Sequence, residues 1–212
     1  MLMPKLLKAF SSVIIVSLLI TSCASGYHAI SPSTLNFQSK SGDSSILVEY
    51  QTNLLSGKYA KREITSDVYL IAVKITNNSS HEIIFKNNLK IFSGEKEVTT
   101  IPLNTFYSAT QQNPDKSLKF LFLTPLNLYT FSQTTDGGQV TSKKNRFYPI
   151  GVIIGPALAF GNLGAAKGAN KKFKKELEQN DILERIILPE HTEYGLIAVK
   201  DISSPSLTFK RN

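Results

Sequence analysis

The chain has 212 residues, a formal net charge of +8 at pH 7 and one cysteine. This length accommodates one domain with a substantial core and an appendage, and it leaves little room for two independent domains. One cysteine excludes an internal disulfide, and the three histidines have no neighbouring Cys or His at the spacing of a zinc site. We therefore expect no metal centre.

Residues 1–22 have the organisation of a secretory signal peptide. A basic start with Lys5 and Lys8 precedes the uncharged run 9–20, which is too short to span a bilayer comfortably. The run ends in Leu-Ile-Thr-Ser-Cys, and this stretch resembles the lipobox of bacterial lipoproteins. The resemblance implies that Cys23 is acylated, with palmitate or a similar chain, and becomes the first residue of the mature protein. An ordinary signal peptide and an uncleaved anchor are the alternatives.

Acylation would decide where the protein works. Each buried methylene of an acyl chain contributes about 0.8 kcal/mol, and stable anchoring takes more than one chain. We expect a cell-envelope protein that is held to the membrane by lipid. Under the sorting rule known for enteric bacteria, Ala24 after the cysteine favours the outer membrane over the inner membrane. An exported chain does not meet nucleic acid, so nucleic acid is not an expected partner despite the positive charge.

The remaining sequence is typical of antiparallel β structure after a flexible start. Residues 23–45 are rich in serine without an apolar period, so we expect a flexible tether. Short runs rich in Val, Ile, Tyr, Phe and Thr follow. The expected strands are 46–51, 67–76, 82–86, 89–93, 96–101, 118–123, 126–131, 193–200 and 206–211. The strand 67–76 carries apolar residues on both faces, so we expect it at the centre of a sheet.

The order of these elements resembles a known architecture. Val-Tyr-Leu-Ile-Ala-Val-Lys-Ile-Thr-Asn-Asn-Ser (68–79), hairpins, a Leu-Pro-Glu-His-Thr turn (188–192) and a Tyr-Gly-Leu-Ile strand are similar to immunoglobulin-like β-sandwiches of small envelope lipoproteins. Glu190 replaces the usual glycine of that turn. The resemblance implies a mainly β, antiparallel sandwich, with its first part at 46–146 and its C-terminal strands at 181–212. Such families mostly serve as adhesion, assembly or accessory modules.

An insert at 147–180 separates the two parts of the expected sandwich. Its first twenty residues are uncharged over about the length of a transmembrane helix, but Pro149, Pro156 and several glycines favour a kinked, Gly/Ala-rich apolar hairpin. A basic amphipathic helix is expected from 165 to 180. Small residues every fourth position and lysines mark the candidate contact residues, which are Gly151, Gly155, Phe160, Gly161, Gly164, Lys167, Lys171, Lys172, Lys174 and Lys175.

Three interpretations of the insert are open. The apolar run could fold back on the sandwich and leave the lysines solvated. It could enter the bilayer to which Cys23 is tethered, with the lysines at anionic head groups. It could also pack on another envelope protein or on copies of itself.

The sequence contains no catalytic or cofactor motif that we can identify. Acidic residues such as Glu49, Glu63 and Asp67 lie singly among strands and turns, where a solvated surface charge is the usual role. We therefore expect a lipid-anchored envelope protein with a structural or protein/membrane interaction role and no catalysis. One alternative is an oligomeric or membrane-remodelling assembly component that works through 147–175. A second is a hydrolase that acts on envelope polymers.

Overall fold

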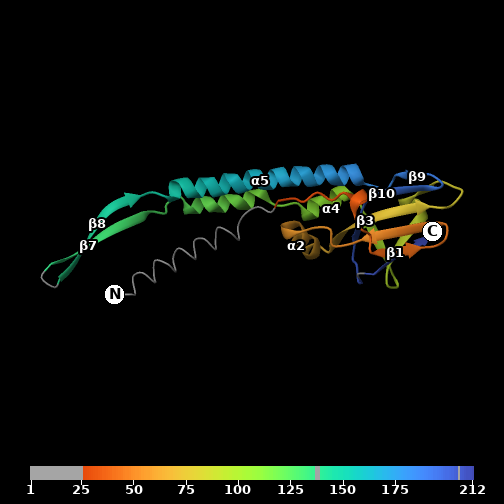
Figure 1. Cartoon of the computed structure of the whole chain (residues 1–212), viewed down its shortest axis with the longest axis horizontal. Helices are drawn as coiled ribbons and strands as arrows, with labels where there is room; N and C mark the ends of the chain where they lie inside the picture. Colours follow the sequence, from red (N-terminus) through yellow and green to blue (C-terminus); the bar gives the residue numbers. More distant parts are fainter. Residues whose placement is uncertain (1–25, 137–138, 205) are drawn as a thin grey trace. The chain divides into compact units, whose positions relative to one another are not determined.

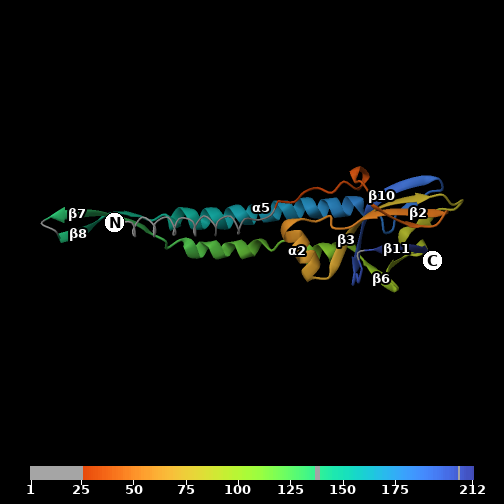
Figure 2. The ribbon, with the colours of Figure 1, turned by 60° about the horizontal axis from the view of Figure 1, so that its bottom comes forward.

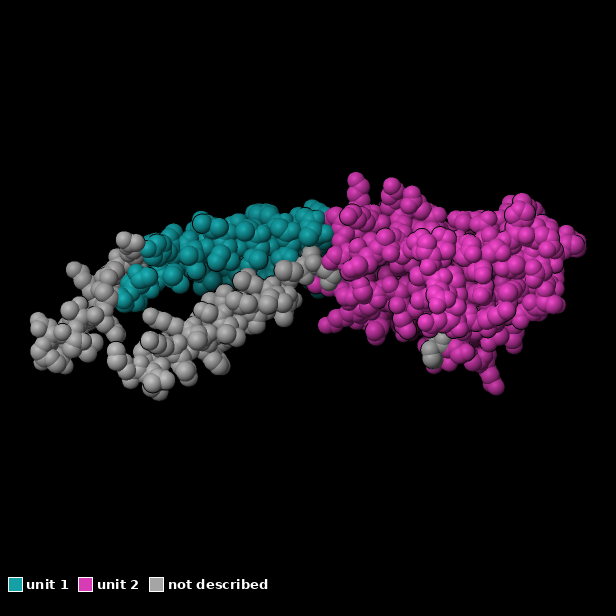
Figure 3. Space-filling model, viewed as in Figure 1, with its two compact units in different colours: residues 1–24, 113–167 teal, residues 25–112, 168–212 magenta. Residues whose placement is uncertain are grey.

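The computed structural model describes residues 26–136, 139–204 and 206–212, with the backbone alone for the parts of 132–146 that it includes (Figure 1). The expected signal peptide, 1–22, and the expected lipidation site, Cys23, lie outside the described residues. The described chain divides into two compact units (Figure 3). The hairpin unit contains 113–167, and the barrel unit contains 26–112 and 168–212. The inserted unit therefore begins earlier than the expected insert, at 113 instead of 147.

The barrel unit is built around an antiparallel sheet of seven strands in the order β1-β2-β3-β10-β6-β5-β11. Its strands are β1 (Ser39–Gly42), β2 (Ile46–Gln51), β3 (Val68–Asn77), β5 (Leu89–Ser93), β6 (Lys96–Ile101), β10 (His191–Lys200) and β11 (Leu207–Arg211). A separate ladder joins β4 (Ile83–Ile84) to β9 (Ile186–Ile187), and the short helix α3 (Phe85–Asn88) occupies the rest of the expected strand 82–86. The prediction of a mainly antiparallel β protein is confirmed.

Strand β3 is an interior strand of this sheet, next to the middle strand β10, as its two apolar faces predict. It pairs with β2 on one side and with β10 on the other. Ile71 and Val73 face the interior of the sheet, whereas Leu70 and Ala72 face the helices on its outer side, and all four are fully buried. A strand covered on both faces gains from apolar residues at every position, which explains its continuous Val-Tyr-Leu-Ile-Ala-Val run.

The sheet curls until its first and last strands approach each other, which makes it nearly barrel-like. The backbone N–H of Phe209 on β11 donates to Ser41 Oγ on β1 at 2.8 Å. The N–H of Leu207 donates to the hydroxyl of Tyr50 on β2, also at 2.8 Å. Side-chain hydroxyls thus satisfy edge groups of β11 that a neighbouring strand would otherwise satisfy.

Three helices cover the outer face of β3 and β10, and an aromatic cluster joins them. They are α2 (Gly57–Thr65), α4 (Leu103–Thr110) and the part of α5 (Gly151–Asn180) that follows residue 167. The ring of Phe173 on α5 lies 4.8 Å from that of Tyr59 on α2 and 6.3 Å from that of Phe106 on α4. Aromatic pairs at these separations add to the stability gained by burial. The sequence analysis predicted neither α2 nor α4.

The expected flexible tether, 23–45, is wrong from Tyr27 onward. The hydroxyl of Tyr27 donates to Glu176 Oε1, its ring lies 4.9 Å from that of Phe173, and the N–H of Ile30 donates to Glu176 Oε1 at 2.7 Å. A 3-10 turn, η1 (Pro32–Thr34), and strand β1 follow. Apolar side chains without a regular period hold this segment to the barrel unit, and sequence periodicity cannot reveal such anchoring.

The hairpin unit corrects three expectations. It contains the 3-10 helix η2 (Pro114–Leu123), the strands β7 (Leu128–Asp136) and β8 (Gln139–Tyr148), and the first part of α5. The expected strand 118–123 is therefore helical, because Pro114 opens a helix whose start Asn113 caps by accepting the N–H of Asp115. The expected strand 126–131 becomes β7, which begins at Leu128, continues to Asp136 and pairs with β8. The expected apolar hairpin is the start of one continuous helix.

One buried stripe explains why α5 is continuous despite Pro156 and its glycines. The buried positions recur every three or four residues along the helix. They are Gly151, Gly155, Ala159, Asn162, Ala166, Ala169, Asn170, Phe173 and Leu177. This spacing keeps one face covered through all eight turns, and such packing outweighs the poor helix propensity of single residues.

Glycines let η2 lie directly against α5 in the hairpin unit (Figures 1 and 2). A Cβ atom on Gly151 would lie 2.1 Å from the backbone oxygen of Leu123, and one on Gly155 would lie 2.8 Å from Thr124 Oγ1. The N–H of Gly151 also donates to the backbone oxygen of Leu126 at 2.9 Å. The close approach that the small-residue spacing predicts therefore occurs within the chain.

We expect opposite effects from two glycine substitutions on α5. Gly151→Ala places a Cβ against backbone and should destabilise the hairpin unit by roughly 1–3 kcal/mol. Gly164→Ala meets open space and should stabilise the helix by roughly 0.5–1 kcal/mol. Urea unfolding followed by circular dichroism, with limited proteolysis to locate the change, measures both. Equal stability of the two variants would contradict the packing of η2 on α5.

Candidate functional site

Exposed apolar side chains gather in the hairpin unit. Of the fifteen large hydrophobic side chains that are exposed among the described residues, twelve lie in 113–167. This exposed apolar set comprises Leu118, Leu121, Phe122, Leu126, Leu128, Tyr129, Phe131, Phe147, Tyr148, Val152, Ile153 and Phe160. Single exposed apolar residues are normal, but a concentration in one small unit indicates an interaction surface.

The base of the β7–β8 hairpin is apolar on both faces. Leu128 pairs with Tyr148, and the next pair, Tyr129 with Phe147, has its rings 5.5 Å apart. Directly paired residues share a face and successive residues alternate, so the two pairs lie on opposite faces. All four side chains are exposed. A two-stranded hairpin is marginally stable in water by itself, so an apolar environment would stabilise this one.

The outer face of α5 in this unit has the same character. Val152, Ile153 and Phe160 are 56%, 75% and 58% exposed and lie outside the buried stripe. By length and composition alone α5 is apolar enough to cross a membrane, and only 28% of its most apolar window is buried.

The hairpin unit is also basic. Its sequence contains six positive residues and two acidic ones, a net charge of +4. The positive residues are Lys116, Lys119, Lys143, Lys144, Arg146 and Lys167, and the acidic ones are Asp115 and Asp136. Lys116, Lys119 and Lys167 are exposed. Apolar side chains beside positive charges are the composition of segments that bind anionic membrane surfaces.

The structure divides the apolar residues that the sequence singled out. Phe160 is exposed, and a Cβ on Gly161 or Gly164 would meet nothing within 4 Å, so these three positions are available for contact. Gly151 and Gly155 are buried against η2, so their expected role in contacting a membrane or partner is wrong. The expected set also lacked the aromatic residues of η2 and of the β7–β8 hairpin.

The predicted lysines of α5 are all exposed. Lys167 belongs to the hairpin unit, whereas Lys171, Lys172, Lys174 and Lys175 belong to the barrel unit. Lys174 approaches Glu178 at 3.7 Å, one turn along the helix. The other i,i+4 carboxylate, that of Glu176, instead accepts hydrogen bonds from Tyr27 and Ile30. Exposed lysines of this kind are free to meet an anionic surface.

A buried amide fixes α5 in the barrel unit. Asn170 Oδ1 accepts hydrogen bonds from the hydroxyl of Tyr59 and from the N–H of Gln112, each at 2.9 Å. Its Nδ2 donates to the backbone oxygen of Gln112 at 2.7 Å. One side chain thus ties α5 to α2 and to the last residue before the hairpin unit. A buried network of this kind is specific because each member would be unsatisfied alone.

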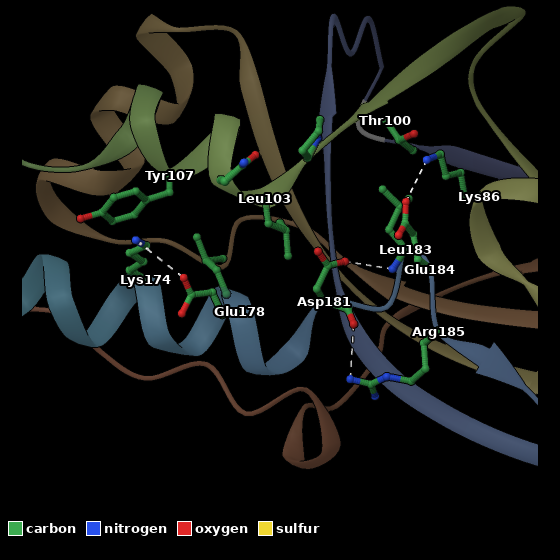
Figure 4. A pocket seen from close by; sticks show the side chains of 13 residues that line it. Lys86, Thr100, Leu103, Tyr107, Lys174, Glu178, Asp181, Leu183, Glu184 and Arg185 are labelled. Carbon is green, nitrogen blue, oxygen red and sulfur yellow. Dashed lines mark hydrogen bonds and ion pairs between the residues drawn. The ribbon is translucent and has the colours of Figure 1, made fainter.

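A cavity of the barrel unit has a volume of about 600 Å³ (Figure 4). The buried side chains of Leu103 on α4 and Leu177 on α5 line it, together with Tyr107. Ion pairs lie along its rim, with Lys86 Nζ 2.9 Å from Glu184 Oε1 and Lys174 Nζ 3.7 Å from Glu178 Oε1. The volume suits a small ligand.

The carboxylates of this cavity are poorly arranged for hydrolysis. A glycosidase-type pair needs one carboxyl that its environment keeps protonated. Lys86 instead lowers the pKa of Glu184, Glu178 is paired with Lys174, and Asp181 Oδ1 accepts the N–H of Leu183. The cavity could therefore hold a ligand, but its carboxylates do not form the general acid and general base that hydrolysis requires.

Glu63 is a buried carboxyl that the sequence analysis assigned to the solvated surface. It is 5% exposed, and its Oε1 accepts the N–H of Leu70 at 2.7 Å. Burial raises the pKa of Glu63 to about 7, and the hydrogen bond from Leu70 opposes the shift in part. Glu63 and Tyr59 lie one turn apart on α2 and are its buried residues. The i,i+4 spacing was the signal that could have identified both.

No protein-family model, curated protein or solved structure matches this chain. The functional assignment therefore depends on the residues and their geometry.

We expect Asn170→Ala to destabilise the barrel unit by roughly 2–4 kcal/mol, because three buried hydrogen bonds, from Tyr59 and to and from the backbone of Gln112, are lost together. Asn180→Ala is the matched control on the same helix. Asn180 donates only to the backbone oxygen of Glu176 and is half-buried, so its loss should cost less than about 1 kcal/mol. Thermal unfolding of the two variants tests this, and equal losses would count against the network.

Glu63 should make stability depend on pH. Because the pKa is raised from 4.5 to about 7 on folding, the folded state binds a proton more tightly than the unfolded state. Stability is therefore greatest below pH 4.5 for this group and falls as pH rises through 7, by up to roughly 3 kcal/mol. Glu63→Gln should remove that fall, whereas Glu95→Gln in an exposed turn should keep it. Urea unfolding at pH 5 and pH 8 provides the measurement. An unchanged pH dependence in Glu63→Gln would refute the assignment.

Proposed function

We propose that this chain is a lipid-anchored cell-envelope protein with a structural or interaction role, and that its hairpin unit contacts the bilayer. The observation that carries the proposal is the exposed apolar set, twelve of the fifteen exposed large hydrophobic side chains among the described residues. The role is binding, without catalysis.

The free energies of burying apolar side chains and of placing lysines near anionic lipid both favour contact of the exposed apolar set with a bilayer. Full burial of one large apolar side chain contributes about 1.5–3 kcal/mol, so insertion of a few members of the set gives firm binding. Each lysine near an anionic surface adds about 1 kcal/mol. Tyr129 and Tyr148 at the hairpin base suit the interfacial region, because the tyrosine side chain combines an apolar ring with a polar hydroxyl.

The expected acyl anchor agrees with this arrangement. Only residues 24–26 separate Cys23 from Tyr27, which is bound to α5 through Glu176 and Phe173. Four extended steps span at most about 14 Å. An acylated Cys23 would hold this part of the barrel unit beside the membrane surface, within reach of the α5 lysines. Ala24 supports the outer membrane as that membrane.

For the barrel unit we propose an immunoglobulin-like sandwich in which β1-β2-β3-β10 and β6-β5-β11 are the two layers. Its support is the apolar core shared by both groups of strands. Tyr50 on β2 and Phe209 on β11 have ring centroids 5.4 Å apart, and Phe209 also contacts Phe85 at 6.2 Å. Side chains that meet in this way are typical of facing sheets. Adhesion and assembly modules commonly use such scaffolds.

A variant of three exposed positions tests membrane contact. Phe122→Ser, Ile153→Ser and Phe160→Ser remove three side chains of the exposed apolar set without touching buried ones. In a Cys23→Ala protein they should weaken partition into anionic vesicles by at least about 100-fold. The matched control is Ile64→Ser, Ile186→Ser and Leu188→Ser, the three exposed large hydrophobic residues of the barrel unit.

Vesicle flotation with and without phosphatidylglycerol gives the partition. Equal partition of the two triple variants would refute the proposal. A different result would favour the assembly alternative. In that case the Cys23→Ala protein does not bind vesicles but forms oligomers, and the triple variant of the hairpin unit is monomeric.

A further inference from the structure

A second cavity of the barrel unit, with a volume of about 220 Å³, has an oxygen-rich lining from four segments of the chain. It is lined by Thr52, Asn53, Glu63, Tyr69, Leu70, Ile202, Ser203 and Ser204. It lies beside the end of β2, whose last residue, Gln51, pairs with Ala72 of β3. Beyond that pair the N–H of Leu70 finds its acceptor in Glu63. The small volume restricts an occupant to a few non-hydrogen atoms.

Glu63 supplies the charge of this cavity. Within the part of the chain that the structure describes, no lysine, arginine or histidine forms an ion pair with it, and Oε1 alone has a hydrogen-bond partner. Oε2 of Glu63 can therefore accept a hydrogen bond from a ligand in the cavity. A buried carboxylate without a positive partner is unfavourable, so a cation that reaches it and can also hydrogen-bond stabilises the ionised form of Glu63.

The lining selects the type of cation. Glu63 is the one acidic residue among those that line it, and the polar residues Thr52, Asn53, Ser203 and Ser204 accompany it. A divalent metal prefers several charged oxygens, whereas an ammonium group offers three N–H donors that a carboxylate and neutral oxygens can share. We propose that this cavity binds a small molecule with a primary ammonium group, and that the ammonium pairs with Glu63.

Binding at this site should have a distinctive pH dependence. Glu63 and Tyr69 are the titratable groups that line the cavity. Burial raises the pKa of Tyr69 above 10, so Glu63 alone titrates near neutrality, at about 7. An ammonium pairs with the ionised carboxylate, whose fraction rises about tenfold between pH 6 and pH 8. Affinity should rise by the same factor, and binding should lower the pKa of Glu63.

The test uses the acylated protein in phosphatidylcholine nanodiscs, with ethanolamine as the probe and choline as the control cation without N–H donors. The carbon NMR signal of the Glu63 carboxyl reports its titration in the wild type. We expect ethanolamine at about 50 mM, above the millimolar Kd of so small a ligand, to lower this pKa. Glu63→Gln should abolish ethanolamine binding and Glu95→Gln should preserve it.

The outcomes separate cleanly. No change in the titration of Glu63, or an equal change with choline, overturns the proposal, and this measurement does not depend on a variant that folds. An equal ethanolamine affinity at pH 6 and pH 8 also overturns it. If the pKa falls in nanodiscs of phosphatidylethanolamine without added probe, the ammonium comes from a lipid head group and the assignment of Glu63 stands.

Discussion

The buried stripe of α5 is the constraint on which both units depend. In the hairpin unit it is made of Gly151, Gly155 and Ala159, whose small size lets η2 approach. In the barrel unit it ends with Phe173 and Leu177, whose large side chains fill the space over the sheet. The buried face of this one helix thus carries small residues in its first half and large residues in its second half. In each half the size of the side chains matches the space between the helix and its neighbours.

Sequence patterns predicted the sheet well, because strands are recognisable as short runs of β-branched and aromatic residues, often alternating with polar ones. The runs that became β2, β3, β5 and β6 were placed within a residue or two, and β3 was correctly expected away from the edges of the sheet. The same reasoning misread η2, because Leu118, Phe120 and Phe122 also alternate. Its cap, Asn113-Pro114-Asp115, was the better signal, since it satisfies the first N–H groups of a helix.

Tertiary packing decided what periodicity could not. Glycine and proline favour a break in 147–166, yet the contact with η2 keeps α5 helical. The anchoring of Tyr27 depends on Glu176 and Phe173, which lie about 150 residues away in the sequence. Among the candidate contact residues, the lysines and Phe160 were recognisable because charge and aromatic character are local properties. The exposure of Phe122 depends on neighbours that sequence spacing does not show, whereas the i,i+4 spacing of Tyr59 and Glu63 was a usable signal of their shared burial.

The two units divide the chemistry of the chain between them. The barrel unit encloses its apolar residues in two cores and keeps its buried polar groups, such as Asn170, hydrogen-bonded. The hairpin unit presents aromatic and aliphatic side chains outward. A fold of this kind separates a stable scaffold from a surface whose stability depends on its surroundings. This division is consistent with the proposed contact of the hairpin unit with a bilayer.

The closure of the barrel unit has a mechanical consequence. Strand β11 is held to β5 by a backbone ladder, but towards β1 and β2 it relies on the hydroxyls of Ser41 and Tyr50. Two such bonds contribute only about 1 kcal/mol each, far less than a full ladder. Under tension or thermal motion this seam would part first. A strand freed there would offer its N–H groups to another chain, so the two hydroxyls also act as a latch against unwanted strand exchange.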